Sequence, residues 1–211
     1  HLGHHQLWRG QRHCIATHRL VVTTLWAGAP VHPERAAVCA HRIHLPAGGA
    51  AKRRVAGGIW HRRKLKAVIP GGPSTAVVPA ALIENATMDY DGLQKIGSSL
   101  GAGSVIIMDD STCMVSALKR LSYFFYEESC GQCTPCREGT GWVYRVIKRI
   151  VDGEGKMEDL DLLTDISNNI SGRTICALGE AAATPVLSFI KHFRPEFEYY
   201  IQHGKSMVTG K

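Results

Sequence analysis

The sequence predicts an α+β protein in which a small sheet-containing unit is followed by a C-terminal helical bundle. Strand-like runs bounded by glycine and proline appear after residue 66, and from residue 114 the apolar residues recur at helical spacing. The N-terminal third shows neither the two-residue spacing of strands nor the helical spacing of apolar residues, so it is expected to be irregular. We therefore expect a segment at 1–66, an α+β unit at 67–113, a helical bundle at 114–204 and a tail at 205–211.

The first segment differs from the rest in composition. Residues 1–66 hold 12 Lys or Arg and one acid, Glu34, for a net charge of +11, whereas the remainder is net −4. They also hold nine of the eleven histidines. A basic arm for nucleic acid, a His-rich metal tract and an out-of-frame reading of GC-rich DNA are three interpretations. The third explains the composition best, so we expect a disordered or frame-shifted segment and no nucleic-acid partner.

The α+β unit is predicted from short elements separated by turn residues. A strand at 66–70 ends in a Pro-Gly-Gly-Pro turn, a short helix or turn follows at 88–95, and a second strand covers 104–108. The Gly-x-Gly sequence before this strand does not fit a dinucleotide fingerprint, which follows a strand and opens a helix. The chain contains no run of eighteen apolar residues, so no direct membrane insertion is expected.

The bundle is predicted from apolar stripes at helical spacing. We expect helices at 114–128, 137–151, 157–170, 180–193 and 195–202. The predicted core residues are Leu118, Leu121, Phe125, Tyr126, Trp142, Val143, Val146, Ile147, Ile150, Leu160, Leu163, Ile166 and Ile170. Short loops between helices of this length are typical of a bundle.

Four cysteines are the candidate metal ligands. Cys130, Cys133 and Cys136 are spaced by three residues, so a tight loop can direct them to three corners of a 4Fe–4S cluster. A loop cannot encircle the whole cluster, and Cys176, 40 residues later, is the natural fourth ligand. Both cysteine segments lead into predicted helix N-termini, whose dipoles favour anionic thiolates. Arg137 and Arg173 would add to this positive field.

Other interpretations of the cysteines remain open. A structural zinc site with four cysteines is possible, although such sites usually contain two Cys pairs. A Cys-x-x-Cys redox disulfide would need a βαβ context, and here helices flank the loop. Cys113 is more typical of a small core residue than of a ligand. We assign no role to Cys14 and Cys39.

Several segments resemble one known family. The sequence FFYEESCGQCTPCREGTGW at 124–142 resembles the cluster loop of the flavoprotein subunit of respiratory complex I, NADH-quinone oxidoreductase, which is called the F-subunit in bacteria. GRTICALGEAA at 172–182 resembles the segment with the fourth ligand, and HFRPE at 192–196 the C-terminal helix signature. KLKAVIPGG at 64–72 and GAGSVIIMD at 101–109 resemble parts of its ubiquitin-like (β-grasp) domain.

The resemblance implies a fold and an electron path. Residues 67–113 would form a whole or partial β-grasp domain, and the four cysteines would bind a 4Fe–4S cluster that takes electrons from NADH through FMN toward quinone. The implied enzyme is NADH-quinone oxidoreductase, a translocase, with other peripheral-arm and iron–sulfur subunits as partners. It would be cytoplasmic, peripheral to the inner side of the bacterial membrane or its mitochondrial matrix equivalent. NAD-linked hydrogenases and formate dehydrogenases share this module and remain alternatives.

The sequence also departs from the family. The family binds FMN and NADH with a Rossmann-like domain that carries a Gly-Arg-Gly-Gly loop before the β-grasp domain, and no such loop occurs in this chain. Residues 1–56 resemble no part of the family. We therefore expect a C-terminal fragment that binds a cluster but neither FMN nor NADH, with no catalytic residue of its own.

Overall fold

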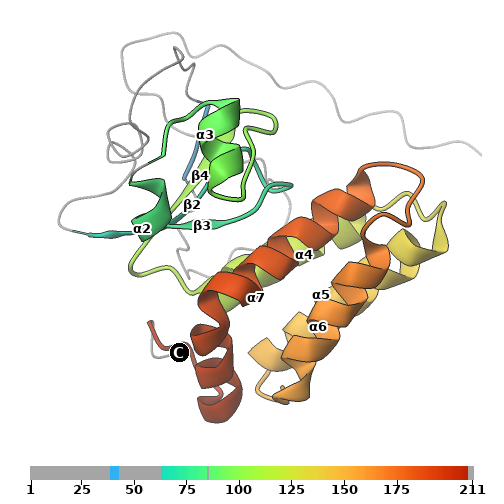
Figure 1. Ribbon diagram of the computed structural model, residues 1–211. Helices are drawn as coiled ribbons and strands as arrows, with labels where there is room; N and C mark the ends of the chain where they lie inside the picture. The colour runs from blue at the N-terminus through green and yellow to red at the C-terminus, as the bar shows by residue number, and fades with distance from the viewer. Residues whose placement is uncertain (1–38, 43–62, 85, 209–211) are drawn as a thin grey trace, which may run out of the picture.

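The computed structural model describes the backbone of residues 39–42 together with residues 63–84 and 86–208. In Figure 1 a small sheet lies beside a bundle of long helices, and two short helices lie with the sheet. The described chain is therefore a mixed structure of helices and a small sheet, as predicted. The predictions for 1–38 and 43–62 lie outside the described residues.

The sheet contains four strands, each antiparallel to its neighbours, in the order β1-β4-β2-β3. Their bounds are Cys39–Arg42 for β1, Leu65–Ile69 for β2, Val78–Pro79 for β3 and Ser104–Asp109 for β4. The two predicted strands are confirmed within one residue. The expectation of an irregular N-terminal third is wrong at β1, because the second edge of β4 offers backbone groups that this segment pairs with.

The two faces of the sheet contribute to different clusters of buried residues. Ile106 and Met108 of β4 pack with the helices of the bundle, whereas Val105 and Ile107 pack on the other face. This alternation follows from the two-residue period of a strand. The second face is covered by α2 (Ala80–Ile83) and α3 (Tyr90–Lys95), of which only α3 was predicted.

The bundle contains four helices. They are α4 (Met114–Glu128), α5 (Thr134–Val151), α6 (Glu158–Ile170) and α7 (Leu178–His203). The predicted boundary between two C-terminal helices is confirmed, because α7 comprises two helices that meet at a kink, where Phe193 has non-helical backbone angles (φ −125°, ψ 20°). Pro195 explains the kink, since it lacks an N–H and its ring crowds the carbonyl of the preceding turn. No helix in the described part of the chain is both long and apolar enough to cross a membrane.

The bundle core matches the predicted stripes except at two aromatic residues. Leu118, Ile147 and Leu163 are fully buried, and the largest fully buried side chains of α7 are Phe189 and Phe197. Trp142 and Tyr126, predicted as core, are 51% and 39% exposed. Both lie toward the end of the bundle where the cysteine loops are, which is the end farther from the sheet in Figure 1.

Polar contacts fasten the sheet to the bundle. Lys66 Nζ of β2 lies 2.6 Å from Glu196 Oε1 of α7, with both side chains largely buried. The other oxygen of Glu196 accepts the Met114 N–H at the start of α4, at 3.4 Å. Ser188 Oγ of α7 accepts the Val77 N–H at 3.0 Å. The sheet and the bundle therefore share one core, a largely buried ion pair and a buried hydrogen bond.

Candidate metal centre

The four predicted ligands occupy two loops at one end of the bundle. Cys130 and Cys133 lie between α4 and α5, Cys136 lies in the first turn of α5, and Cys176 lies two residues before α7. In Figure 1 these loops lie together at the end of the bundle farther from the sheet. All four are free thiols, as is the buried Cys113 at the start of α4. The structure begins α5 three residues earlier than predicted, so Cys133 is its N-cap and Cys136 is helical.

Close packing of α5 against α6 brings the second loop near the first. A Cβ on Gly139, one turn after Cys136, would lie 2.6 Å from the Ile170 side chain. Ile170 is the last residue of α6, and the loop to Cys176 starts directly after it. A larger residue at position 139 would force the Ile170 side chain to move. Gly139 therefore helps to bring the fourth cysteine to the other three.

The second loop is fastened to the start of α7. The Glu180 carboxylate accepts the Ser171 hydroxyl at 2.6 Å and also accepts the Gly172 N–H. The Thr174 hydroxyl donates to the Cys176 carbonyl oxygen at 2.8 Å. Since an acid in the first turn also complements the helix dipole, Glu180 stabilises both the loop and the helix end.

The cysteines differ in exposure but act on one another electrostatically. Cys130 and Cys176 are exposed, Cys133 is half-buried and Cys136 is 4% exposed. Burial raises the pKa of the Cys136 thiol, and the charges of the other three cysteines raise it further. A hydrogen bond with Ser129 acts in the opposite direction on this pKa. The fold therefore brings Cys176 into the electrostatic neighbourhood of the first loop.

Ser129 contacts a predicted ligand directly. Its Oγ lies 3.3 Å from Cys136 Sγ, and it accepts the Gly131 N–H at 3.4 Å. The residue follows α4 in an extended conformation, which turns the chain from the helix into the cysteine loop. Gly131 has φ +71°, a conformation that glycine adopts without strain.

The two arginines expected to strengthen the positive field have other partners nearby. Arg137 Nε lies 3.0 Å from Glu138 Oε1, and Arg173 donates to Asn169 Oδ1 at 2.5 Å. The ion pair with Glu138 offsets part of the positive charge of Arg137. The partner of Arg173 is a neutral amide, so the positive charge of Arg173 is not offset and adds to the dipoles at the N-termini of α5 and α7.

The donor set suits a metal group that is held by sulfur ligands. Four thiols are soft ligands suited to iron–sulfur clusters or zinc. A zinc ion needs its sulfur ligands at about 2.3 Å from one point. Within residues 63–84 and 86–208, no group of three or more His, Cys, Asp or Glu side chains, the four cysteines included, is already arranged to hold a metal ion. In a cubane each cysteine binds a different iron, so the four thiols need to surround a larger volume.

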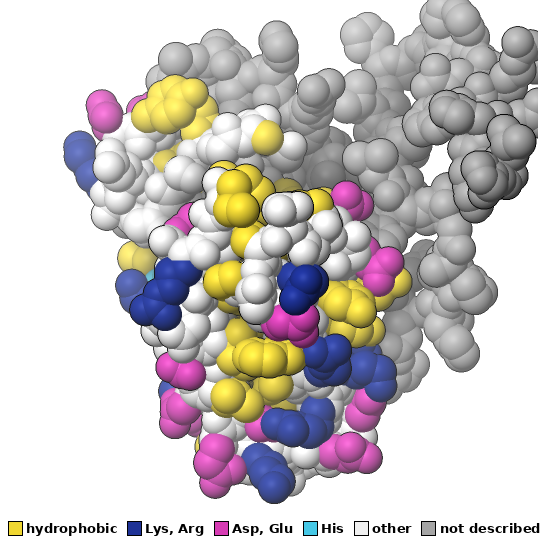
Figure 2. Space-filling view, turned by 90° about the vertical axis from the view of Figure 1, so that its right-hand side faces the viewer, with side chains coloured by type: hydrophobic (Ala, Val, Ile, Leu, Met, Phe, Trp, Pro, Cys, Tyr) yellow, Lys and Arg dark blue, Asp and Glu magenta, His cyan; other side chains and the backbone are white. Residues whose placement is uncertain are grey.

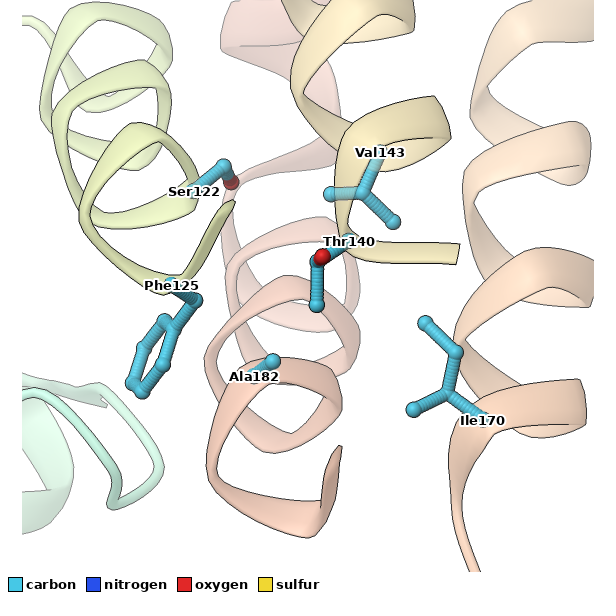
Figure 3. Close-up of a pocket in the computed structure, with 6 residues that line it drawn as sticks. All are labelled: Ser122, Phe125, Thr140, Val143, Ile170 and Ala182. Atoms are coloured by element: carbon cyan, nitrogen blue, oxygen red, sulfur yellow. The ribbon is translucent and has the colours of Figure 1, made fainter. Parts of the chain in front are cut away.

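A narrow crevice lies inside the bundle near this centre. Figure 3 shows the six side chains that line it, Ser122, Phe125, Thr140, Val143, Ile170 and Ala182, which come from all four helices. The crevice leaves no room for a water molecule. The Thr140 hydroxyl donates to the Cys136 carbonyl oxygen at 2.8 Å, whereas Ser122 Oγ is buried without a hydrogen-bond partner.

Exposed apolar side chains lie close to the cysteines in the sequence. Ile175, beside Cys176, is 77% exposed, and Trp142, in the second turn after Cys136, is 51% exposed. Figure 2 shows the side of the molecule that lies on the right in Figure 1, and hydrophobic side chains form a central band on it, flanked by basic and acidic residues. An apolar band with a charged surround is typical of a surface that contacts another protein.

Comparison with known proteins gives a consistent family match for this part of the chain. Residues 116–200 match the family model described as the NADH-ubiquinone oxidoreductase-F iron-sulfur binding region. This range includes all four candidate cysteines and all but the ends of the bundle. The predicted resemblance is thus confirmed for the C-terminal part of the chain.

Individual relatives support the same match. The chain is 53% identical over 145 residues to the NADH-quinone oxidoreductase F-subunit 1 of Rhizobium meliloti, covering 69% of this chain and 33% of the relative. It is 55% identical over 138 residues to the F-subunit of the same enzyme in Rickettsia bellii, covering 65% and 33%. The chain therefore spans about a third of the length of these relatives. A solved NAD⁺-reducing [NiFe]-hydrogenase superposes with a TM-score of 0.66 at 27% identity, over 77% of this chain and 27% of that one.

The sequence analysis missed two residues of the site. Neither Ser129 nor Glu180 was singled out, although both lie in the motifs that carry the resemblance. Ser129 adjoins Cys130, and a hydroxyl next to a predicted ligand is a usable signal for a hydrogen bond to sulfur. Glu180 lies at a predicted helix start, where an acid commonly accepts backbone N–H groups.

Proposed function

We propose that Cys130, Cys133, Cys136 and Cys176 hold a 4Fe–4S cluster and that the chain transfers electrons as part of an NADH-quinone oxidoreductase. The match of residues 116–200 to the NADH-ubiquinone oxidoreductase-F iron-sulfur binding region carries this proposal. A bound cluster of this type accepts and donates single electrons. The electrostatic coupling of Cys176 to the first cysteine loop supports the same ligand set.

The residues of the chain would hold and shield the cluster. The nearly fully buried Cys136 would hold the cluster where water is excluded, whereas the exposed Cys130 and Cys176 would hold it where solvent has access. The first turns of α5 and α7 stabilise the negative charge of the thiolates. Glu180 holds the loop of Cys176 in place through Ser171 and Gly172.

The parent enzyme is proposed by comparing how similar the chain is to two kinds of known protein. The identity of 53% to a component of NADH-quinone oxidoreductase exceeds the 27% to the NAD⁺-reducing hydrogenase, so the quinone-linked enzyme is the favoured assignment. The structural match to the hydrogenase makes an NAD-linked hydrogenase subunit the second candidate. We further propose that FMN and NADH are bound outside the described residues.

Other parts of the assignment follow from the same similarity. We propose that residues 67–113 form a β-grasp domain and residues 114–204 the cluster-binding bundle, which the two-faced sheet and the four-helix core support. We propose iron–sulfur and other peripheral-arm subunits as partners, at the inner side of the membrane. The exposed Trp142 and Ile175 near the cysteines support a protein contact at this end.

The proposed function is tested by metal loading. Anaerobic reconstitution with iron and sulfide should give a brown chain that contains both in equal amounts and that dithionite bleaches. Replacing Cys136 or Cys176 with alanine should abolish stable loading, because each removes one of four ligands. Cys113→Ser is the matched control and should load fully, since Cys113 lies at the start of α4 and not in the cysteine loops. A colourless chain that binds one zinc ion would refute the proposal.

A further inference from the structure

Ser129 is placed to act on one particular cysteine. Its Oγ lies 3.3 Å from Cys136 Sγ, within the range of a hydrogen bond to sulfur. Either atom could donate in this pair when the thiol is protonated. A cysteine that binds iron is a thiolate and has no proton, so in the loaded protein the hydroxyl of Ser129 must be the donor.

The backbone fixes the hydroxyl in this position. Ser129 is extended (φ −66°, ψ 121°) directly after α4, and its oxygen accepts the Gly131 N–H at 3.4 Å. Gly131 can offer this N–H because the loop turns through a positive φ at that residue. The Gly131 amide, the Ser129 hydroxyl and the Cys136 sulfur therefore form a short chain in which each group polarises the next.

The contact involves the most buried of the four cysteines. Cys136 is 4% exposed, whereas Cys130 and Cys176 are exposed. A hydrogen bond in a low-dielectric environment is electrostatically stronger than one in water. A different hydroxyl, that of Thr174, lies near Cys176 but donates to its carbonyl oxygen and not to its sulfur.

We infer that Ser129 is a positioning residue that donates a hydrogen bond to the Cys136 sulfur and thereby raises the reduction potential of the bound cluster. The inference rests on the proposed function, since it requires a cluster at these cysteines. Donation to a ligand sulfur draws electron density from the cluster and stabilises its reduced, more negative state. Ser129 thus makes the cluster a better electron acceptor without binding iron itself.

The test compares two isosteric variants of the reconstituted full chain. Ser129→Thr keeps a hydroxyl and Ser129→Val replaces it with a methyl group of nearly the same shape. We expect the Thr variant to retain the wild-type midpoint potential in an EPR-monitored redox titration. The Val variant should shift to lower potential by up to about 59 mV, which is a tenfold change in the one-electron reduction equilibrium. Thr174→Val is the matched control and should leave the potential unchanged.

The outcomes separate this inference from the proposed function. If the wild-type chain takes up no iron and sulfide, the proposed function fails before Ser129 is examined. If the Thr and Val variants both load and have equal potentials, the role of Ser129 is refuted while the cluster site stands. Loading of the Thr variant but not the Val variant would support the hydroxyl as the group that positions Cys136.

Discussion

The two ends of the helical bundle are stabilised in different ways. At the sheet end, Phe189, Phe197 and Leu118 are fully buried, and the Lys66–Glu196 ion pair lies between β2 and α7. At the cysteine end, two of the four candidate ligands are exposed, and hydrogen bonds of the loops provide much of the order. Apolar burial thus holds the fold at one end, and polar contacts arrange the candidate ligands at the other.

This difference has a physical reason. The proposed cluster would have to form between these loops and exchange electrons with a partner, which requires that the loops are not fully enclosed. Loops with little apolar contact open at lower free-energy cost than packed helices. Rigid helices anchored at the sheet end can hold such loops in position even though the loops themselves bury little apolar surface. The comparison predicts that substitutions of similar size should have unequal effects at the two ends.

Truncation of Phe189 should give the largest effect on stability. Phe189→Ala removes a fully buried ring from the shared core and should lower the free energy of unfolding by about 3–5 kcal/mol. Urea denaturation followed by circular dichroism measures this change. The matched variant at the cysteine end is Ile175→Ala, which removes an exposed side chain and should cost less than about 0.5 kcal/mol. Equal costs at the two sites would contradict the comparison.

The second prediction compares ion pairs at the two ends. Glu196→Ala leaves Lys66 largely buried without its carboxylate and removes the acceptor of the Met114 N–H, at an expected cost of about 3 kcal/mol. Glu138→Ala breaks the exposed pair with Arg137 near the cysteines and should cost less than about 0.5 kcal/mol. Both values come from urea midpoints at neutral pH. A small cost for Glu196→Ala would show that the sheet is not fastened to α7 through this residue.

The sequence predicted regular elements where the hydrophobic period dominates. The α4 bounds, the α6 core and the strands β2 and β4 follow from the spacing of apolar residues, because burial decides these positions. The four cysteines were selected from their spacing and from family resemblance, and the fold brings Cys176 near the first loop. The short elements β3 and α2 were missed, because a segment of a few residues is too short to show a periodic spacing of apolar residues.

The features that the sequence alone did not predict depend on contacts between different parts of the fold. Trp142 continues an apolar stripe in the sequence, yet it is exposed between the buried Gly141 and Val143, so it lies on the outer face of α5. Pro195, by contrast, marked the kink of α7 correctly, because a proline cannot donate a hydrogen bond to the preceding turn. The bond from Ser129 to Cys136 joins residues seven apart, and it depends on the turn after α4, which periodicity does not describe.

The third prediction concerns Asp109 at the end of β4. Burial alone would raise its pKa, but hydrogen bonds from Ser111 and Thr112 and the charge of Arg63 outweigh this and lower the pKa below its ordinary value of 3.8. A depressed folded pKa means that the carboxylate stabilises the fold above pH 3.8, and this stability is lost as the pH falls through the folded value. Asp109→Asn should therefore cost about 1 kcal/mol at neutral pH.

The pH dependence distinguishes this carboxylate from its neighbour. The difference between wild type and Asp109→Asn in urea denaturation should be constant from neutral pH down to about 4 and should shrink at lower pH. The control is Asp110→Asn, which changes the adjacent carboxyl and should leave stability within about 0.5 kcal/mol. A difference that persists unchanged in acid would exclude the charge of Asp109 as its cause.

The smallest expected effect lies at the border between the two ends. Ser122 and Thr140 line the same crevice in Figure 3, but only the Thr140 hydroxyl has a hydrogen-bond acceptor, the Cys136 carbonyl. Removing a buried hydroxyl without a partner removes its desolvation cost, so Ser122→Ala should raise stability by about 0.5 kcal/mol. Thr140→Val should lower it by about 1 kcal/mol, because the carbonyl loses its donor. Thermal unfolding of both variants measures the contrast. If Ser122→Ala destabilises the chain instead, its hydroxyl serves the polar network of the cysteine end, and that network extends one helical turn deeper into the bundle.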